Sequence, residues 1–152
     1  MEEITVIIIS ACLVGINCSY CSQNAEHPDA VKLVMEGKAI PICPEQLGGL
    51  NTPREPAEIN NGRILTVSGV DITEAFLRGA DETLKVCRKF SCKKAILKSR
   101  SPSCGVGMIY DGNFNGTLVK GNGVTADLLI KNGINVTSSD ALQKMTDPFT
   151  TD

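Results

Sequence analysis

The fold is decided near the N-terminus by the run Ile4-Thr5-Val6-Ile7-Ile8-Ile9, which is β-branched throughout. A run of this kind is typical of a strand buried on both faces of a parallel sheet. Three further short strands are predicted at residues 39–42, 95–98 and 134–137. Between them we predict a helix from Pro28 to before Gly37, a longer one that starts near Thr73 and includes Cys87, and one over residues 124–132. The pattern predicts an α/β fold: a three-layer, Rossmann-like, doubly wound and mainly parallel sheet with right-handed crossovers.

Residues 47–73 are rich in glycine and proline and are predicted to form a loop-rich insertion. Within it, Asn60-Asn61-Gly62 predicts a tight hairpin turn before a strand over residues 63–67. A second hairpin or loop is expected between residues 108 and 119, and a last helix over 140–145. We expect a single domain over residues 1–147 and a frayed tail over 148–152.

The composition is that of an ordinary globular domain. Of 152 residues, 42% are apolar and 21% are charged, which excludes disordered, collagen-like and coiled-coil proteins. The longest apolar stretch falls short of the roughly 18 residues that a membrane span needs, so no membrane partner is expected. The chain opens Met1-Glu2-Glu3, without the basic region of a secretory signal, and we expect it in the cytoplasm.

The net charge of -2 predicts no general attraction to nucleic acid. Local charge differs, because seven of the fifteen Lys and Arg residues fall between Lys85 and Arg100. This basic segment is predicted to be either a solvated helix face and turn or a contact for an anion or RNA.

Three of the seven cysteines, Cys12, Cys43 and Cys104, each lie just after a predicted strand. Because the carboxyl ends of parallel strands meet at one edge of a sheet, we expect these thiols to converge there. In a reducing compartment, thiols are more often metal ligands or catalysts than disulfides. Three convergent thiols can hold Zn²⁺ with an open fourth position, or three irons of a 4Fe-4S cluster with one iron left open, or they can act as a nucleophile with resolving thiols.

The other cysteines are weaker candidates. Cys18-x-x-Cys21 lies in a loop near the same edge, where the two thiols are either unpaired loop residues or further ligands or resolving partners. Cys87 falls on the apolar face of the long helix, so we expect it in the core. Cys92, in the turn before the third strand, is a minor ligand candidate.

Polar residues near the three thiols are the candidate catalytic and substrate-binding groups. Glu45 is either an acid, base or hydrogen-bond partner in the site or an ordinary acid at a helix N-terminus. Lys98 either neutralises an anionic site or caps the sheet. The single histidine, His27, is predicted to start a helix rather than to catalyse. Groups that can bind a substrate oxygen or a cluster sulfide, or simply form a turn, surround Cys104: Ser101, Ser103 and Gly105.

Three motifs resemble those of a known family. They are Cys12-Leu13-Val14-Gly15 with Cys18; Cys43-Pro44-Glu45-Gln46-Leu47-Gly48-Gly49-Leu50 with Thr52-Pro53-Arg54 and Pro56-Ala57-Glu58-Ile59; and Leu97-Lys98-Ser99-Arg100-Ser101-Pro102-Ser103-Cys104-Gly105. On these segments, and weaker ones that extend over almost the whole chain, the sequence resembles the 2-thiouracil desulfurase (TudS-like) family. It departs from the family at Cys18-Ser19-Tyr20-Cys21-Ser22, where members commonly carry Cys-Arg-Tyr-Asp-Gly.

The resemblance implies a 4Fe-4S cluster held by Cys12, Cys43 and Cys104. Zinc, which the three thiols can also hold, is the alternative metal. It also implies non-redox desulfuration of a thiolated nucleobase such as 2-thiouracil: the open iron takes the sulfur, water replaces it at carbon and hydrosulfide leaves. Glu45 and Ser101 are the implied catalytic residues, which transfer protons and orient substrate or water. The expected substrate contacts are Ser10, Lys98, Ser103 and Gly105.

We expect a free thiolated base or nucleoside as the substrate, and tRNA only as a secondary option that the basic segment keeps open. Two other functions remain as alternatives. One is a redox or sensing module that binds zinc or a cluster without desulfurase activity, and the other is a thiol-disulfide enzyme that uses Cys18 and Cys21.

Overall fold

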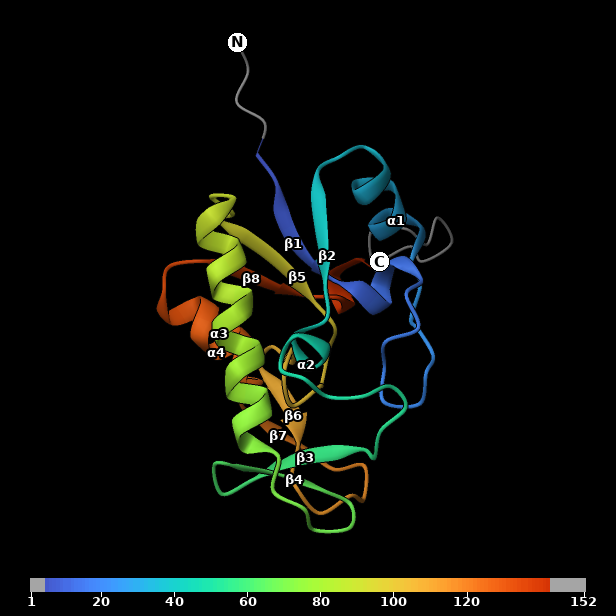
Figure 1. The fold of residues 1–152 in the computed structure, drawn as a ribbon, viewed down its shortest axis with the longest axis vertical. Helices are drawn as coiled ribbons and strands as arrows, with labels where there is room; N and C mark the ends of the chain where they lie inside the picture. Colours follow the sequence, from blue (N-terminus) through green and yellow to red (C-terminus); the bar gives the residue numbers. More distant parts are fainter. Residues whose placement is uncertain (1–4, 143–152) are drawn as a thin grey trace, which may run out of the picture.

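The computed structural model describes residues 5–142. Its central sheet contains four parallel strands, β1 (Ile7–Ser10), β2 (Ala39–Ile42), β5 (Lys94–Leu97) and β8 (Asn135–Ser138), in the order β2-β1-β5-β8 (Figure 1). The predicted α/β class with a mainly parallel sheet is thus confirmed. β1 begins at Ile7 rather than at residue 4, because β2 starts only at Ala39, the register partner of Ile7.

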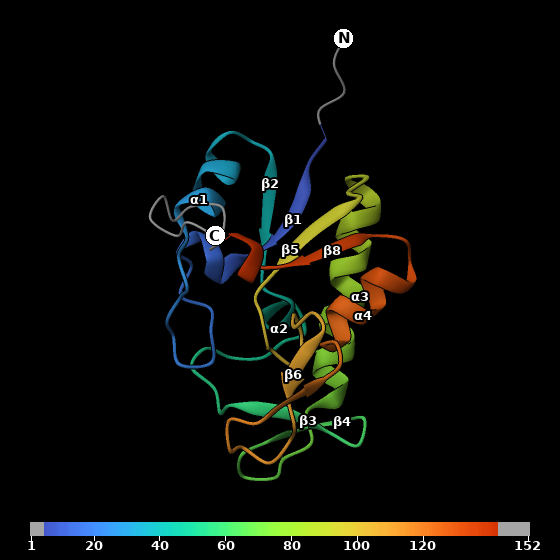
Figure 2. The ribbon, with the colours of Figure 1, turned by 180° about the vertical axis from the view of Figure 1, so that it is seen from behind.

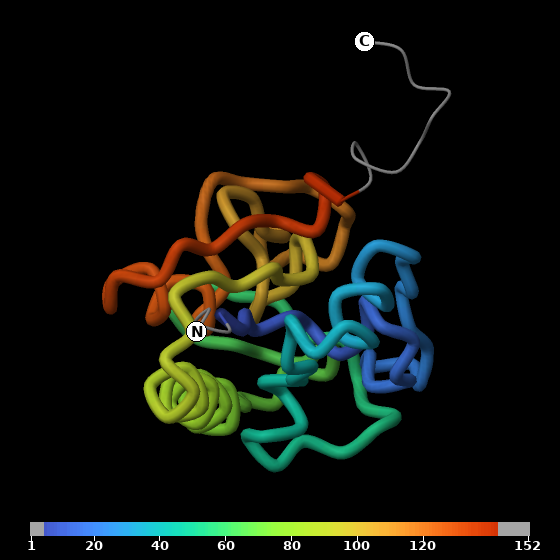
Figure 3. Tube along the Cα trace, turned by 90° about the horizontal axis from the view of Figure 1, so that it is seen from above, coloured from blue at the N-terminus to red at the C-terminus, as the bar shows by residue number. Residues whose placement is uncertain are grey.

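Helices cover both faces of this sheet and make three layers. Helix α1 (Pro28–Met35) lies on one side, whereas α3 (Thr73–Lys89) and α4 (Val124–Lys131) lie on the other (Figures 2 and 3). Pro28 occupies the first turn of α1, and His27 is its N-cap, whose Nδ1 accepts a hydrogen bond from the Asp29 N–H at 3.2 Å. His27 therefore starts a helix, as its position before Pro28 predicts.

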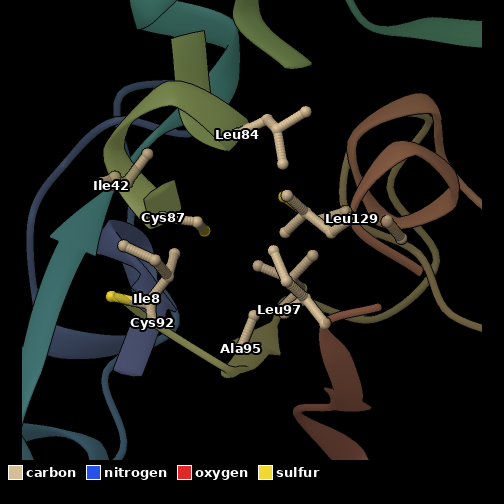
Figure 4. Close-up of a cluster of buried hydrophobic side chains, with 11 residues drawn as sticks. Ile8, Ile42, Leu84, Cys87, Cys92, Ala95, Leu97 and Leu129 are labelled. Atoms are coloured by element: carbon tan, nitrogen blue, oxygen red, sulfur yellow. The ribbon is translucent and has the colours of Figure 1, made fainter. Parts of the chain in front are cut away.

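Successive side chains of β1 point to opposite faces of the sheet, and the core therefore consists of two clusters, one on each face. Ile8 packs with Leu84 of α3 and Leu129 of α4, and this cluster includes Cys87 (Figure 4). Ile9 points to the other face, where it packs with Leu13 and Ala30. Both isoleucines are 0% exposed, and complete burial of such a side chain contributes roughly 1.5–3 kcal/mol. The β-branched run thus supplies both faces of the central strand, and Cys87 is a core residue as predicted.

Two hairpins lie beyond the carboxyl ends of the sheet strands (Figures 1 and 2). The first, β3 (Ala57–Asn60) with β4 (Arg63–Thr66), forms within the predicted insertion and turns at Asn61 and Gly62, whose φ values are 49° and 77°. Positive φ at both central residues is the geometry that Asn-Gly favours in tight hairpins. The second is β6 (Met108–Tyr110) with β7 (Leu118–Lys120). Glu58 joins the hairpins, because its Oε1 accepts hydrogen bonds from the N–H groups of Gly112 at 3.0 Å and Phe114 at 3.1 Å.

A short helix, α2 (Pro44–Leu47), follows β2 directly and packs on α3. The contact is a close approach of two backbones. A Cβ atom on Gly79 would overlap the carbonyl oxygen of Pro44, and one on Gly48 would overlap that of Ala75. The two glycines therefore allow α2 to sit against α3 and fix the position of the segment around Cys43.

The helix predicted over residues 140–145 extends outside the described residues, and the tail predicted over 148–152 lies wholly outside them. The division into a domain over 1–147 and a tail stays a prediction. None of the helices that the structure describes is long and apolar enough to span a bilayer.

Candidate active site

A cavity of about 560 Å³ opens where the strands β1, β2 and β5 end. The chain leaves β1 toward β2 on one side, whereas β5 flanks β1 on the other, so the strand ends part here and form a crevice. The cavity brings together seven of the nine residues predicted for the site, although they come from three separate segments. They are Ser10, Cys12, Cys43, Glu45, Lys98, Ser101 and Cys104.

Cys12 lies in η1 (Ala11–Val14), a single 3₁₀ turn that continues β1. The turn ends at Gly15, whose φ of 92° is the left-handed conformation that glycine adopts readily. The Cys12 carbonyl accepts a hydrogen bond from the Ala25 N–H at 2.9 Å, which holds the end of the following loop beside this turn. The Cys12 thiol is half-buried on the cavity wall.

Cys43 follows β2 and is the N-cap residue of α2, with Pro44 at the first helical position. Glu45 stands in the first turn of this helix and also lines the cavity. The two positions considered for it from the sequence, a helix N-terminus and the site, are therefore both correct. Burial raises the pKa of the Glu45 carboxyl, whereas the Arg54 guanidinium beside it lowers that pKa in part. The Arg54 Nη2 and Glu45 Oε2 atoms are 3.2 Å apart.

Cys104 is held by a turn that Ser101 organises. The Ser101 Oγ atom accepts hydrogen bonds from the N–H groups of Ser103 at 3.0 Å and of Cys104 at 2.8 Å. Because this hydroxyl accepts both bonds, its own proton is left to donate into the cavity. Cys104 is 5% exposed, and burial raises the pKa of its thiol to about 12, against opposing hydrogen bonds from Ser10 and Ser103.

Ser10 and Lys98 connect the ends of β1 and β5. The Ser10 Oγ atom accepts a hydrogen bond from the Lys98 N–H at 2.9 Å and also contacts the Cys104 thiol. The Lys98 ammonium lies 3.4 Å from the Ser99 hydroxyl and places a positive charge on the cavity wall. Arg100 adds a second cation there and has a φ of 69°.

Ser103 and Gly105 lie behind the wall instead of on it. The Ser103 hydroxyl is 2.8 Å from that of Thr125, and Ser103 is 1% exposed. A Cβ atom on Gly105 would come within 2.8 Å of the Ser101 carbonyl oxygen, so this glycine permits close packing. Their predicted contact with substrate gains no support from the cavity lining.

Two further residues belong to the site, and of these Arg54 was not singled out from the sequence as a chemical group. Cys18, considered from the sequence as either an unpaired loop residue or a further ligand or resolving partner, is 2% exposed and lines the cavity. Its thiol hydrogen-bonds with those of Cys12 and Cys43; the bond with Cys12, followed by burial, raises the pKa of Cys18 to about 11, against an opposing effect of Cys43. Arg54 stands in the second motif, and its guanidinium bonds to the carbonyl of Cys18 at 3.0 Å as well as to Glu45. The place of Arg54 in this motif is the sequence signal that could have identified it as a site residue.

The aromatic side chains of the wall were also missed. Tyr20 lines the cavity from the loop after η1, whereas Tyr110 and Phe114 line it from the β6–β7 hairpin. No sequence pattern predicts their convergence, because it depends on how this loop and this hairpin meet. Cys21, in contrast, is exposed, and its thiol contacts Gln23 at 3.4 Å and Ser19 at 3.6 Å.

The donor set suits an iron-sulfur cluster. Thiolates are the usual ligands of such clusters, and Cys12, Cys43 and Cys104 lie on the wall of one cavity. The contact with the Cys18 thiol, followed by burial, raises the pKa of Cys43, and burial raises the pKa of Cys104, so metal binding would release their protons. Between residues 5 and 142, no three His, Cys, Asp or Glu side chains are arranged so that they could hold a single metal ion.

Comparisons with known proteins agree with the motifs. A family model described as 2-thiouracil desulfurase matches residues 7–141. The "Uncharacterized protein YbbK" of Bacillus subtilis (strain 168) is 45% identical over 146 residues, which cover 90% of this chain and 97% of that protein. A solved structure named as the [4Fe-4S]-dependent thiouracil desulfidase TudS is 43% identical, with a TM-score of 0.87 over 92% of this chain and 94% of that one. The resemblance stated from the motifs is confirmed, and the chain belongs to the 2-thiouracil desulfurase family.

Proposed function

We propose that this protein is an iron-sulfur-dependent desulfurase that removes sulfur from a thiolated nucleobase such as 2-thiouracil and releases it as hydrosulfide. One observation carries the proposal: Cys12, Cys43 and Cys104 line a single cavity together with Glu45 and Ser101. The family membership and the name of the solved relative support the same activity.

Cys12, Cys43 and Cys104 would hold a 4Fe-4S cluster and leave one iron without a protein ligand. When bound, the cluster supplies a Lewis-acidic iron for the sulfur of the substrate. Overall, a C=S bond and water become a C=O bond and hydrosulfide, with no change in oxidation state. The protein's own residues must therefore bind the ring, deliver water to carbon and move protons.

Glu45 is the residue that we assign to proton transfer. Its carboxylate lies on the wall and is held by Arg54, so it can take a proton from water as the water attacks carbon. The Ser101 hydroxyl, whose proton is free to point into the cavity, would orient the water or the developing oxygen of the product. Lys98 supplies positive charge beside the anionic leaving group.

The cavity fits a small planar substrate. Its volume of about 560 Å³ falls within the roughly 300–1,000 Å³ of small-molecule sites. Tyr110 and Phe114 provide aromatic surface on which a heterocyclic ring can stack. We therefore propose a free base or a nucleoside as the substrate.

The placement of the basic segment disfavours tRNA. Lys94 starts β5, and Lys98 follows its end, so the strand separates the basic residues before it from those at the cavity. Only Lys98 and Arg100 of the segment line the cavity. The cytoplasmic location expected from the sequence stays a prediction.

The test is to purify or reconstitute the protein without oxygen, then measure iron, labile sulfide and visible absorption, together with hydrosulfide release from 2-thiouracil. We expect about four irons per chain and release of hydrosulfide, both lost in Cys104→Ala. The Cys21→Ala variant is the matched control, since that thiol is exposed and should change neither result. Stoichiometric zinc, or no metal after reconstitution, would overturn the cluster, and a full cluster without hydrosulfide release would favour a sensing module.

A further inference from the structure

The loop that follows η1 buries one of its side chains in the cavity and exposes its neighbours. Cys18 is 2% exposed, whereas Ile16 and Tyr20 are 44% and 48% exposed. The thiol of Cys18 reaches the cavity wall, and the mechanism described above assigns no role to it. A buried thiol on a mostly exposed loop requires a reason for its position.

Residues outside the loop hold Cys18 in place. Arg54 Nη2 donates a hydrogen bond to the Cys18 carbonyl at 3.0 Å, and the Arg54 N–H donates to the Tyr20 carbonyl at 2.7 Å. Arg54 thus fixes the backbone on both sides of Ser19. Because these bonds come from a different segment of the chain, the direction of the Cys18 side chain does not depend on the loop alone.

Cys43 is the thiol that also reaches the backbone of Cys18. The two thiols hydrogen-bond to each other, and Cys43 Sγ also lies 3.7 Å from the Cys18 carbonyl oxygen. Cys12 contacts the Cys18 thiol as well, but it shows no such bond to the backbone of Cys18. Cys21 turns away, toward Gln23 and solvent. The Cys-x-x-Cys spacing therefore does not predict which thiol lies beside Cys18 in the fold.

We propose that Cys18 is a resolving thiol, which forms a disulfide with Cys43 whenever Cys43 is not engaged as a metal ligand. The oxidant is a low-molecular-weight disulfide of the glutathione type. Its S–S bond breaks as the half-buried Cys43 sulfur attacks, which forms a mixed disulfide on Cys43 and releases one small thiol. The Cys18 sulfur then attacks the Cys43 sulfur, forms the protein disulfide and releases the second small thiol. Two cysteine thiols are oxidised, one small disulfide is reduced to two thiols, and both protons pass to the released thiols.

Such a disulfide would preserve the site. A thiol left without its metal can proceed to sulfinic and sulfonic acids, which thiols do not reverse. A disulfide is returned to two thiols by exchange, and Cys43 is then available again for a cluster. The inference goes beyond the proposed desulfuration and depends only on the arrangement of the thiols.

The experiment uses the full chain, either loaded with cluster or freed of iron by a chelator, and treats both without oxygen with oxidised glutathione. Free thiols are then counted by alkylation and mass, and linked peptides are mapped without reduction. Trypsin leaves Cys43 in the peptide 39–54 but leaves Cys12, Cys18 and Cys21 together in the peptide 1–32. Fragmentation of the linked pair, and the variants Cys18→Ser and Cys21→Ser, identify the partner.

We expect the iron-free chain to lose two of its seven thiols and to link the peptides 1–32 and 39–54 through Cys18. Cys21→Ser should behave in the same way, whereas Cys18→Ser should retain one glutathione on Cys43. A free Cys18 beside a glutathionylated Cys43 would overturn the proposal, as would a bond from Cys18 to Cys12 or Cys21. Cluster-loaded protein should keep both thiols. Formation of the bond with the cluster intact would contradict Cys43 as a ligand and with it the proposed site, which separates the two failures.

Discussion

Arg54 and Glu45 form an ion pair in which the Nη2 and Oε2 atoms are 3.2 Å apart and the side chains are only 8% and 20% exposed. The same guanidinium bonds to the carbonyl of Cys18, so one cation positions both the candidate base and the buried thiol. Ion pairs at the surface contribute little to stability. Removal of one partner of a buried pair is costly, because the other charge then remains buried without a partner.

Arg54→Ala should therefore weaken both the fold and the reaction. We expect a loss of stability of about 1–3 kcal/mol, the usual cost of leaving a buried polar group unpaired, and a fall in kcat of at least about tenfold. Urea unfolding and hydrosulfide release measure the two effects. Arg63→Ala removes an exposed guanidinium from a different ion pair and serves as the control for hydrosulfide release. Unchanged kcat in Arg54→Ala would show that Glu45 does not need this positioning.

Glu45→Gln should separate catalysis from cluster binding. The substitution keeps the shape of the side chain but removes the base, so we expect hydrosulfide release to fall by about 10²–10⁴ while iron content is unchanged. Glu55→Gln is the matched control, because Glu55 also lines the cavity but accepts a hydrogen bond from Ser68 at 2.8 Å. If Glu45→Gln keeps full activity, the proton is moved by another group.

Ser101→Ala should affect cluster retention as well as rate. The variant leaves the N–H groups of Ser103 and Cys104 without their acceptor, and each unsatisfied group costs about 1–3 kcal/mol when it is buried. We expect faster loss of iron to a chelator and a lower kcat, and Ser101→Thr should restore iron retention because it keeps the acceptor. Iron retention equal to the parent in Ser101→Ala would limit Ser101 to a catalytic role.

Gly79→Ala should disturb the site from a distance. The new methyl group would overlap the Pro44 carbonyl and push α2 away from α3, and such overpacking costs about 1–3 kcal/mol. Asp81→Ala, at an exposed position of the same helix, is the control. Both variants are compared by chemical denaturation and by iron content after reconstitution, and equal behaviour would exclude this contact as a support of the Cys43 segment.

Asp71 should make the stability depend on pH in the acid range. Hydrogen bonds from the Thr73 hydroxyl and N–H, and then Arg63, lower the pKa of Asp71 to about 2 from its ordinary 3.8. Because the folded-state pKa is depressed, the contribution is fully present above the ordinary pKa and is lost as the pH falls toward 2. Urea unfolding between about pH 5 and pH 2, the range that the shift covers, measures this effect. The free energy of unfolding of Asp71→Asn should vary less with pH in this range than that of the parent, and an unchanged dependence would contradict the assignment.

The sheet and the three strand-end cysteines could be predicted because each depends on local pattern and one general rule. The β-branched run around Ile8 marks the central strand, and parallel strands bring their ends together wherever the intervening chain goes. Glu45 and Ser101 could be predicted as well, because they lie in the same segments of the sequence as Cys43 and Cys104. These residues needed no knowledge of long-range packing.

The roles of Cys18 and Arg54 could not be read in the same way. Whether Cys18 is buried depends on Arg54, 36 positions further along the chain, and a Cys-x-x-Cys spacing suggests a local pair instead. Ser103 shows the reverse case: it is adjacent to a ligand candidate in sequence, but it does not line the cavity, and its hydroxyl lies 2.8 Å from that of Thr125.

The N–H groups of Gly112 and Phe114 donate to Glu58 and so join into one rim of the pocket two hairpins that contribute no strand to the central sheet. A change of loop length or side chain in this rim can therefore alter which heterocycle the pocket accepts without moving the sheet edge that carries Cys12, Cys43 and Cys104.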